Sequence, residues 1–326
     1  GTPMHYPLAL TVKDDTIHLD FAGAPPQLPQ GGLNCTLNYT MAHATYPLKC
    51  MLTPNVRGNA GCYRAFTVDA PKGSILNCDK PLAVNLRTRT GWYLAPNIFR
   101  ALSEAAPKQV QAFTGLPVAA SVYGRDAAGD TYSDMLFCGG GQGGSAQGDG
   151  KSGLLYPTSA ANTSIETFES RVPVLVVEKT YLTDSGGAGQ HRGGLGQRVR
   201  LRKLSDDGLP TLVSLYPEGV NNPIPGLFGG KAGGGASGRV IDEQGHVLKD
   251  VGTGELVQVR QPQEIVELVL AGGAGYGPAS ERSREAIARD IALGFVSPDA
   301  AKRDYGVQGA HATQDVGEAK AGILVA

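Results

Sequence analysis

The sequence predicts an α+β, β-rich fold in which many short strands are joined by glycine-rich loops and a helix closes the chain. Glycine and proline contribute 46 and 21 of the 326 residues, which favours frequent turns but falls short of a low-complexity composition. Many short segments alternate between apolar and polar residues, as half-buried strands do. The clearest helical pattern comes late, at 281–293. We therefore expect sheets rather than a helical bundle.

The strand pattern begins almost at once. Residues 8–21 alternate around the polar turn Lys13-Asp14-Asp15 and predict a hairpin. The segments on either side of 184–196 also read as strands, and the later one alternates as a half-exposed strand does. Strands after the hairpin are expected at 65–68, 118–123, 135–137, 172–177, 197–202, 212–215, 240–248, 255–259 and 265–269.

Helical patterns are fewer. They occur at 36–52, 94–106, 281–293 and 299–305. Pro47 lies inside the first, so that helix is expected to kink or stop there. Ser280 is the expected cap of the third, and the residues from 308 onward predict an extended arm.

The length allows two modest domains or one large β-rich domain. We expect an N-terminal β-rich part at 1–170 and a C-terminal β-rich part with the closing helices at 171–326, unless the two form a single domain.

The net charge of −1 argues against nucleic acid or an anionic membrane as a partner. The longest apolar stretch, near 265–273, is too short to span a bilayer, and no signal-peptide pattern opens the chain. We expect a soluble, cytoplasmic protein. The five cysteines, expected to be reduced and mostly buried, are Cys35, Cys50, Cys62, Cys78 and Cys138.

The six histidines are scattered and show no HxH, HxxxH or HxxE spacing. We therefore expect no complete metal site within this chain. Glu166 and Glu169 would share a face if helical, but a capping arrangement of Thr163 with Glu166 is a plainer account than a cation site.

The densest glycine run is Asp184-Ser-Gly-Gly-Ala-Gly-Gln-His-Arg-Gly-Gly-Leu-Gly196. So many glycines imply left-handed backbone or the close approach of a phosphate, a carboxylate or another strand. A second run, Gly139–Gly144, lacks the Lys-Ser/Thr of a P-loop, so tight turns or backbone crossing are favoured over nucleotide contact.

Three side chains of the densest run could carry chemistry. Asp184, His191 and Arg192 could supply an acid/base pair and a donor for a developing oxyanion. The plainer alternative, which we favour, is that Asp184 caps or turns the loop while Arg192 pairs with it or with another carboxylate.

The run 184–196 resembles the DSGGAGxxRGGxG signature of the hydantoinase B family. That family includes subunits of ATP-dependent hydantoinases, 5-oxoprolinases and lactamases, and the ketone carboxylases. Ala24 and Ser164 replace a usual Thr and Pro. The other segments that resemble family motifs, in order, are Asp20–Gln27 (DFxGTxxQ), Asn59–Arg64 (NxGxxR), Ala70–Asn77 (PxGSxLN), Gly139–Gly141 with Asp149-Gly150 (GGG…DG), Ile165–Pro173 (PxExxExxxP), Gly272–Pro278, Arg289–Gly294 and Tyr305–Val307.

The resemblance implies that part of the usual subunit lies elsewhere. Family members normally carry a long N-terminal part before the DFxG segment, with metal-binding His and Asp residues, whereas here only a hairpin precedes Asp20. Either the chain is a fragment or a separate polypeptide carries the missing N-terminal half. The second arrangement resembles the small split subunit of acetophenone carboxylase.

That resemblance implies a subunit of a multi-subunit, biotin-independent, ATP-dependent carboxylase. It would join bicarbonate to an aromatic, acetophenone-like ketone through phosphorylated intermediates and yield a 3-oxo acid. A hydantoinase A-like partner would bind ATP and Mg, and the isolated chain would be inactive. Two alternatives stay open: a subunit of an ATP-dependent cyclic amide hydrolase, and a structural subunit without catalytic side chains.

On the family reading, the catalytic candidates are His191, Arg192 and Asp184. The residues implied for substrate binding are Asn34, Asn59, Arg64 and Asp149, and no metal ligand is assigned.

Overall fold

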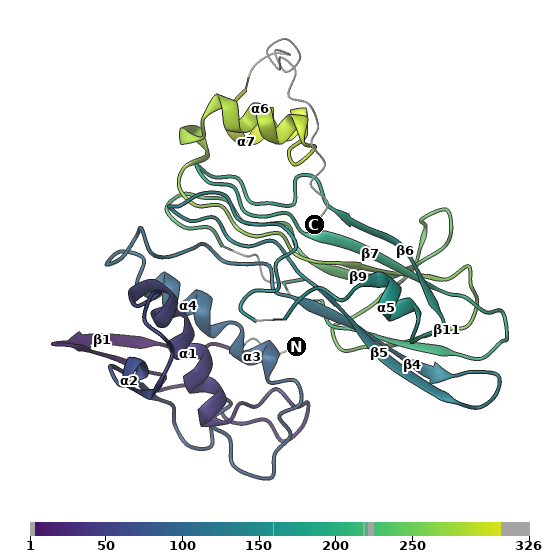
Figure 1. Cartoon of the computed structure of the whole chain (residues 1–326), viewed down its shortest axis with the longest axis horizontal. Helices are drawn as coiled ribbons and strands as arrows, with labels where there is room; N and C mark the ends of the chain where they lie inside the picture. The colour runs from purple at the N-terminus through teal and green to yellow at the C-terminus, as the bar shows by residue number, and fades with distance from the viewer. Residues whose placement is uncertain (1–3, 159, 218, 221–224, 308–326) are drawn as a thin grey trace.

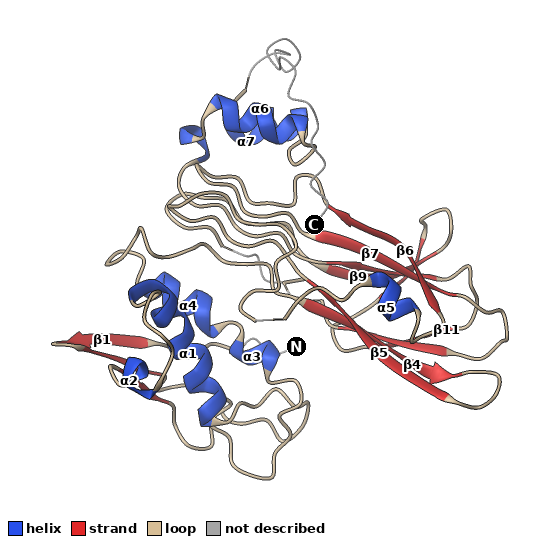
Figure 2. Ribbon diagram, in the orientation of Figure 1, coloured by secondary structure: helices blue, strands red, loops and turns tan. Residues whose placement is uncertain are grey.

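The computed structural model of the chain describes residues 4–158, 160–217, 219–220 and 225–307. Figure 1 shows an N-terminal α/β part, a pair of long sheets and a pair of C-terminal helices, joined by a set of extended segments that run side by side. Strands dominate and helices are few (Figure 2), which confirms the β-rich α+β prediction. The arm expected from residue 308 lies outside the described residues.

The N-terminal part contains a three-stranded sheet covered by helices. The expected hairpin is present, and β3 pairs with β2 in parallel. Its apolar core includes Leu19, Phe66 and Ile98. Its elements are β1 (Ala9–Lys13), β2 (Thr16–Asp20), α1 (Leu37–Leu52), α2 (Ala60–Tyr63), β3 (Phe66–Asp69), α3 (Thr88–Gly91) and α4 (Leu94–Ala101).

Helix α1 corrects one expectation, because it runs through Pro47 to Leu52 without stopping. Proline removes one intrahelical hydrogen bond. Leu48 and Met51, beyond the proline, are nevertheless buried in the N-terminal core, and the backbone N–H of Thr53 closes the last turn on the carbonyl of Lys49. Tertiary burial therefore outweighs the local penalty.

Two antiparallel sheets share the second core. One has the strand order β11-β8-β4-β5 and the other β10-β9-β12-β7-β6. Buried and half-buried residues alternate along β7, as the sequence predicted. The elements are β4 (Val118–Arg125), β5 (Thr131–Cys138), α5 (Ile165–Glu169), β6 (Val174–Tyr181), β7 (Gln197–Lys203), β8 (Thr211–Leu215), β9 (Ser237–Ile241), β10 (Val247–Asp250), β11 (Leu256–Val259) and β12 (Ile265–Val269).

The short helix α5 answers the question raised by Glu166 and Glu169. Ser164, rather than Thr163, caps the helix, and its hydroxyl also bonds to the Glu166 carboxylate. Glu169 accepts a hydrogen bond from the backbone N–H of Val176. The two carboxylates are thus used in capping and in holding β6.

The C-terminal helices α6 (Arg284–Ala292) and α7 (Pro298–Tyr305) form a small unit with its own apolar cluster around Ile287 and Val296. Helix α6 begins later than expected because Ser283, not Ser280, caps it through a bond from the N–H of Ala286. Ser280 lies in the preceding 3-10 turn, Ala279–Glu281.

The glycine-rich segments form the centre of the molecule. We call the extended segments 112–115, 139–153, 185–196, 226–234 and 271–277 the glycine bundle. Each segment bonds to several others through the backbone, as when Gly141 N–H donates to Ala271 O at 3.0 Å and Gly194 N–H donates to Gln142 O at 2.7 Å. A β-carbon on Gly141 would lie 1.9 Å from the carbonyl oxygen of Gly194. Close backbone approach therefore explains the glycines, and the neighbour of 184–196 is other backbone.

The bundle lies between the two large cores. One core draws on residues between 19 and 110, with Tyr276 from the last segment of the bundle, and the other on residues between 118 and 270. The division of the chain at residue 170 stays a prediction.

Candidate functional site

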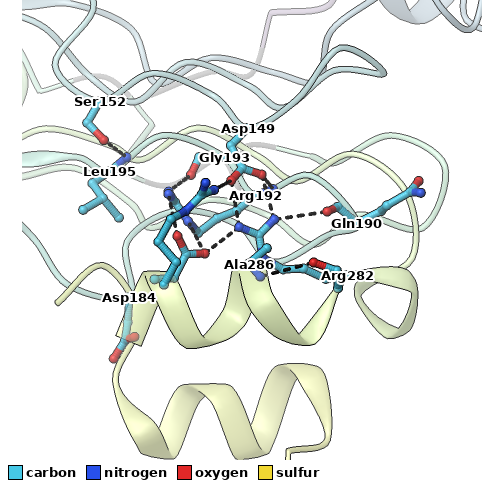
Figure 3. Close-up of polar contacts among 12 residues, drawn as sticks. Asp149, Ser152, Asp184, Gln190, Arg192, Gly193, Leu195, Arg282 and Ala286 are labelled. Carbon is cyan, nitrogen blue, oxygen red and sulfur yellow. Dashed lines mark hydrogen bonds and ion pairs between the residues drawn. The ribbon is translucent and has the colours of Figure 1, made fainter. Parts of the chain in front are cut away.

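A buried cluster of four charged side chains joins the glycine bundle to the C-terminal helices. Arg192 and Asp149 come from the bundle, and Arg282 lies just before α6 (Figure 3). Asp290 lies within α6. The side chains of Arg192, Arg282 and Asp290 are only 5%, 2% and 2% exposed. Two positive and two negative charges offset each other, as burial requires.

The geometry commits both arginines to this cluster. Arg192 Nε lies 3.1 Å from Asp290 Oδ2, and Arg192 Nη1 donates to Gly193 O at 2.6 Å. Arg282 donates two parallel bonds to Asp149, each of 2.7 Å, and a third of 2.6 Å to Asp290 Oδ2. Bidentate pairs of this kind are the strong form of the interaction. This pairing with another carboxylate matches the plainer alternative for Arg192.

Burial and pairing act in opposite directions on the pKa values. Burial alone would raise the pKa of Asp149, but the hydrogen bonds and charge of Arg282 outweigh it, so the pKa is lowered. Burial would lower the pKa of Arg282, but the hydrogen bonds that Arg282 donates to Asp149, and the charge of Asp149, raise it instead. Both groups are therefore held in their charged forms.

Asp184 lies apart from this cluster (Figure 3) and is exposed. Its backbone is left-handed, with φ of 65°. Its carboxylate accepts a 2.7 Å bond from the N–H of Ser297, the residue that caps α7, and its own N–H bonds to Phe295 O. The structure thus places Asp184 where it turns the loop and attaches α7.

His191 lies next to Arg192 in the chain but differs from it in burial and contacts. Its backbone pairs with that of Tyr276, and its half-buried ring lies 6.3 Å from the Tyr276 ring, centroid to centroid. No described residue forms a hydrogen bond with the imidazole. Among Asp184, His191 and Arg192, it has the uncommitted side chain.

The other sequence candidates lie in the N-terminal part. Asn34 is fully buried and bonds to both backbone groups of Leu28, at 2.8 Å each. Asn59 caps α2 by accepting a bond from Cys62 N–H. Arg64 is exposed at the end of α2. Of the sequence candidates, the structure therefore brings together Asp149, His191 and Arg192, whereas Asp184 lies apart from them.

Sequence reasoning did not identify Arg282 and Asp290 as partners of this cluster. The sequence places both residues in the expected helix at 281–293, and Asp290 also lies in a segment that resembles a closing motif of the family. Their partners lie 133 and 98 residues away in the chain. An ion pair between residues so far apart in the chain produces no pattern in the sequence around either residue.

Two small pockets border the bundle. One, of about 50 Å³, is lined by Asn97, Arg100, Gln111 and Phe113 among others. The other, of about 10 Å³, lies between Asp184 and Tyr305. Both are far smaller than usual ligand sites, which hold about 300–1,000 Å³.

Within the described ranges, no group of three or more His, Cys, Asp and Glu residues is arranged to hold a metal ion. All five cysteines are free, with Cys35 and Cys138 buried and Cys50 exposed. No helix in the described part of the chain is long and apolar enough to cross a membrane.

The chain belongs to the hydantoinase B/oxoprolinase family, whose model matches residues 2–279. An uncharacterized protein of Methanocaldococcus jannaschii is 31% identical over 310 residues, which is 92% of this chain and 52% of the relative. The caprolactamase subunit beta of Pseudomonas jessenii is 30% identical over 312 residues, covering 91% of this chain and 52% of that subunit. This chain thus spans about half the length of both relatives.

Solved structures agree with the family assignment. The crystal structure of ATP-dependent caprolactamase from Pseudomonas jessenii matches with a TM-score of 0.79 at 27% identity, over 94% of this chain and 54% of that one. Nucleotide-free acetone carboxylase matches with a TM-score of 0.75, over 94% of this chain and 45% of that one. At 19% identity, the second likeness shows a common fold only.

Proposed function

We propose that this chain forms about half of a hydantoinase B-type subunit in a multi-subunit, ATP-dependent enzyme that opens a cyclic amide. The likeness to caprolactamase carries the proposal, because it joins 30% sequence identity with a TM-score of 0.79 over nearly the whole chain. The remaining half of such a subunit and an ATP-binding, hydantoinase A-like subunit with Mg are the proposed partners.

The chemistry of such an enzyme begins with an inert carbonyl. Transfer of the terminal phosphoryl group of ATP to the amide oxygen makes the ring carbon electrophilic. Water then attacks that carbon, the ring C–N bond breaks as the nitrogen takes up a proton, and an acyl phosphate is left. A second water hydrolyses the acyl phosphate to the carboxylate and phosphate. In sum, a cyclic amide, ATP and two waters give an amino acid, ADP and phosphate. We assign phosphoryl transfer to the partner and a wall of the site to this chain.

Carboxylation of an aromatic ketone with bicarbonate, the function implied by the split-subunit resemblance, is the second candidate. The fold shared with acetone carboxylase favours it. Both reactions use ATP to activate an oxygen atom, but only carboxylation consumes bicarbonate. A purely structural role for this chain is the third candidate, favoured by the commitment of Arg192, Asp149 and Asp184 to internal contacts.

The test uses the untagged protein from its natural source. Native mass spectrometry should find it with larger partners, and ADP release by that complex should be stimulated by caprolactam, hydantoin or 5-oxoproline without bicarbonate. Stimulation by acetophenone only when bicarbonate is present would establish the second candidate instead. A monodisperse single chain, or ADP release that no carbonyl compound changes, would refute both enzymatic proposals.

A further inference from the structure

The backbone around His191 is fixed at four successive polar groups. The carbonyl of Gln190 accepts a 3.1 Å bond from Arg282 Nη1, and the N–H of Arg192 donates a 2.7 Å bond to Asp149 Oδ1. Between them, His191 N–H donates to Tyr276 O at 3.0 Å, and His191 O accepts from Tyr276 N–H at 2.9 Å.

The first and last of these bonds come from one ion pair. Arg282 and Asp149 are joined to each other by two bonds of 2.7 Å. They also bond to the backbone on either side of His191, at Gln190 O and Arg192 N–H. The pair is held from behind by Asp290, which bonds to both Arg282 and Arg192. A side chain on a backbone held in this way has little freedom apart from its own rotation.

The imidazole itself forms no hydrogen bond with a described residue, and it is half-buried. Aromatic rings adjoin it in series, because Tyr276 lies beside His191 and Phe228 packs edge-on against Tyr276 with centroids 5.1 Å apart. Phe228 is 42% exposed and has a left-handed backbone, with φ of 51°. Residues in sparsely populated backbone regions cluster at functional sites.

We propose that Arg282 and Asp149 are a positioning pair for His191, and that the His191 imidazole contacts the carbonyl substrate in the assembled enzyme. The proposal rests on the proposed function for its substrate. A neutral imidazole can either donate to a carbonyl oxygen or accept a proton from attacking water. The exposed Phe228 ring, which packs against Tyr276, would lie beside the apolar part of a cyclic substrate.

The first test measures His191 directly. In the assembled enzyme, His191→Gly should lower kcat roughly 100-fold or more. Added imidazole should then raise the kcat of this variant at least about tenfold. A structural residue would not be rescued in this way. Turnover within about twofold of the parent, or a loss that imidazole does not restore, would overturn the contact role of His191.

The second test measures the positioning pair. Arg282→Lys keeps the charge but cannot make the two parallel bonds to Asp149 and the bond to Gln190 O together. It should lower kcat roughly 10- to 100-fold while KM changes about twofold or less. Asp149→Asn is the milder second variant if Arg282→Lys does not assemble.

Lys203→Met is the matched control, because Lys203 is also a buried cation, paired with Asp207, and it lies at the end of β7 away from the glycine bundle. Even if Lys203→Met lowers Tm as much as Arg282→Lys does, its kcat should equal that of the parent. Arg289→Ala removes an exposed arginine 3.8 Å from Asp149 and should also be silent. Equal losses of kcat in Arg282→Lys and Lys203→Met would mean that Arg282 and Asp149 only stabilise the fold and do not position His191.

Hydrogen exchange separates this inference from the proposed function. In Arg282→Lys the amides of His191 and Arg192 should exchange at least about tenfold faster, while those of β7 are unchanged. This measurement needs no activity. If no carbonyl substrate is turned over, the proposed function fails, and exchange alone still decides the positioning role. Unchanged exchange at both amides would overturn it.

Discussion

At the scale of single residues, the glycine bundle predicts that some glycines tolerate no side chain at all. In Gly141→Ala the new methyl group would lie 1.9 Å from Gly194 O and 2.4 Å from Gly273 N, so backbone must move. We expect the free energy of unfolding to fall by about 2 kcal/mol or more, measured by urea denaturation.

Gly58→Ala is the control for that substitution. Gly58 is exposed, and its added methyl group would lie 3.6 Å from the Tyr63 hydroxyl oxygen, an ordinary contact. Its stability should stay within about 0.5 kcal/mol of the parent. Equal stability of the two alanine variants would mean that the bundle is not closely packed.

The buried charge cluster makes a second prediction at this scale. Asp290→Ala removes the carboxylate that bonds to both Arg192 and Arg282 and leaves buried positive charge in excess. Loss of one partner of a buried pair costs about 3–5 kcal/mol, and thermal unfolding should show a correspondingly lower Tm.

The comparison variant is Arg303→Ala, which breaks an exposed pair with Asp304. Pairs in that setting contribute about 1 kcal/mol or less. If Asp290→Ala were no more destabilising than Arg303→Ala, the cluster would not hold the C-terminal helices in place.

How far the site could be predicted depends on the range of each interaction. The turn at Asp184 could be anticipated, because a left-handed residue in a glycine-rich loop is a local feature, whereas its bond from Ser297 N–H, 113 residues away, could not. For Arg192, the sequence predicted pairing with a carboxylate but not which carboxylate. Its carboxylate partner, Asp290, lies 98 residues away, and nothing in the intervening sequence indicates which acidic residue approaches it.

At the scale of elements, α1 carries a histidine that makes stability depend on pH. His43 stacks against Tyr39, with ring centroids 4.4 Å apart. Burial, and then the charge of Arg87, lower the pKa of His43 from 6.5 to about 4. The unfolded chain therefore binds a proton more readily than the folded chain between these two values.

Stability should consequently be full above pH 6.5 and fall as the pH is lowered toward 4. Allowing for partial solvent exposure, we expect a loss of roughly 2 kcal/mol across this window, seen in urea denaturation at several pH values. His43→Gln should flatten the curve there, whereas His5→Gln, at an exposed site, should keep it. An unchanged slope in His43→Gln would refute this assignment.

Elements whose pattern agreed with their burial were predictable. The alternating strand β7 and the helices α6 and α7 have sequences in which apolar residues form the buried face. The hairpin of β1 and β2 was predictable from its alternation and turn, although Val12 is 63% exposed. Pro47 is the instructive exception, because a local rule about helix interruption was overridden by the burial of Leu48 and Met51. Packing against distant segments decides whether a helix continues through a proline, and these contacts cannot be predicted from hydrophobic periodicity.

At the scale of the whole molecule, the glycine bundle determines whether the two large cores unfold together. Tyr276 belongs to the N-terminal core although it follows the second core in the chain, and its hydroxyl donates to Pro107 O at 2.8 Å. The bundle segments 112–115 and 271–277 are joined by backbone bonds, such as Ala274 N–H to Phe113 O. The two cores are thus connected both by the chain itself and by hydrogen bonds between segments of the glycine bundle.

We therefore expect one cooperative transition rather than two. The chain's single tryptophan, Trp92, lies 8% exposed beside α3 and α4, so its fluorescence reports on the N-terminal part. Amide hydrogen exchange of β4 and β7, measured at each urea concentration, reports on the two long sheets, since each of these sheets contains one of the two strands. Both signals should give the same urea midpoint, which is the usual criterion for two-state unfolding. Gly141→Ala should lower both midpoints equally, because it acts on the segment that joins the cores. Separate midpoints in the parent protein, or a shift of one signal alone in the variant, would show that the bundle connects two independent domains.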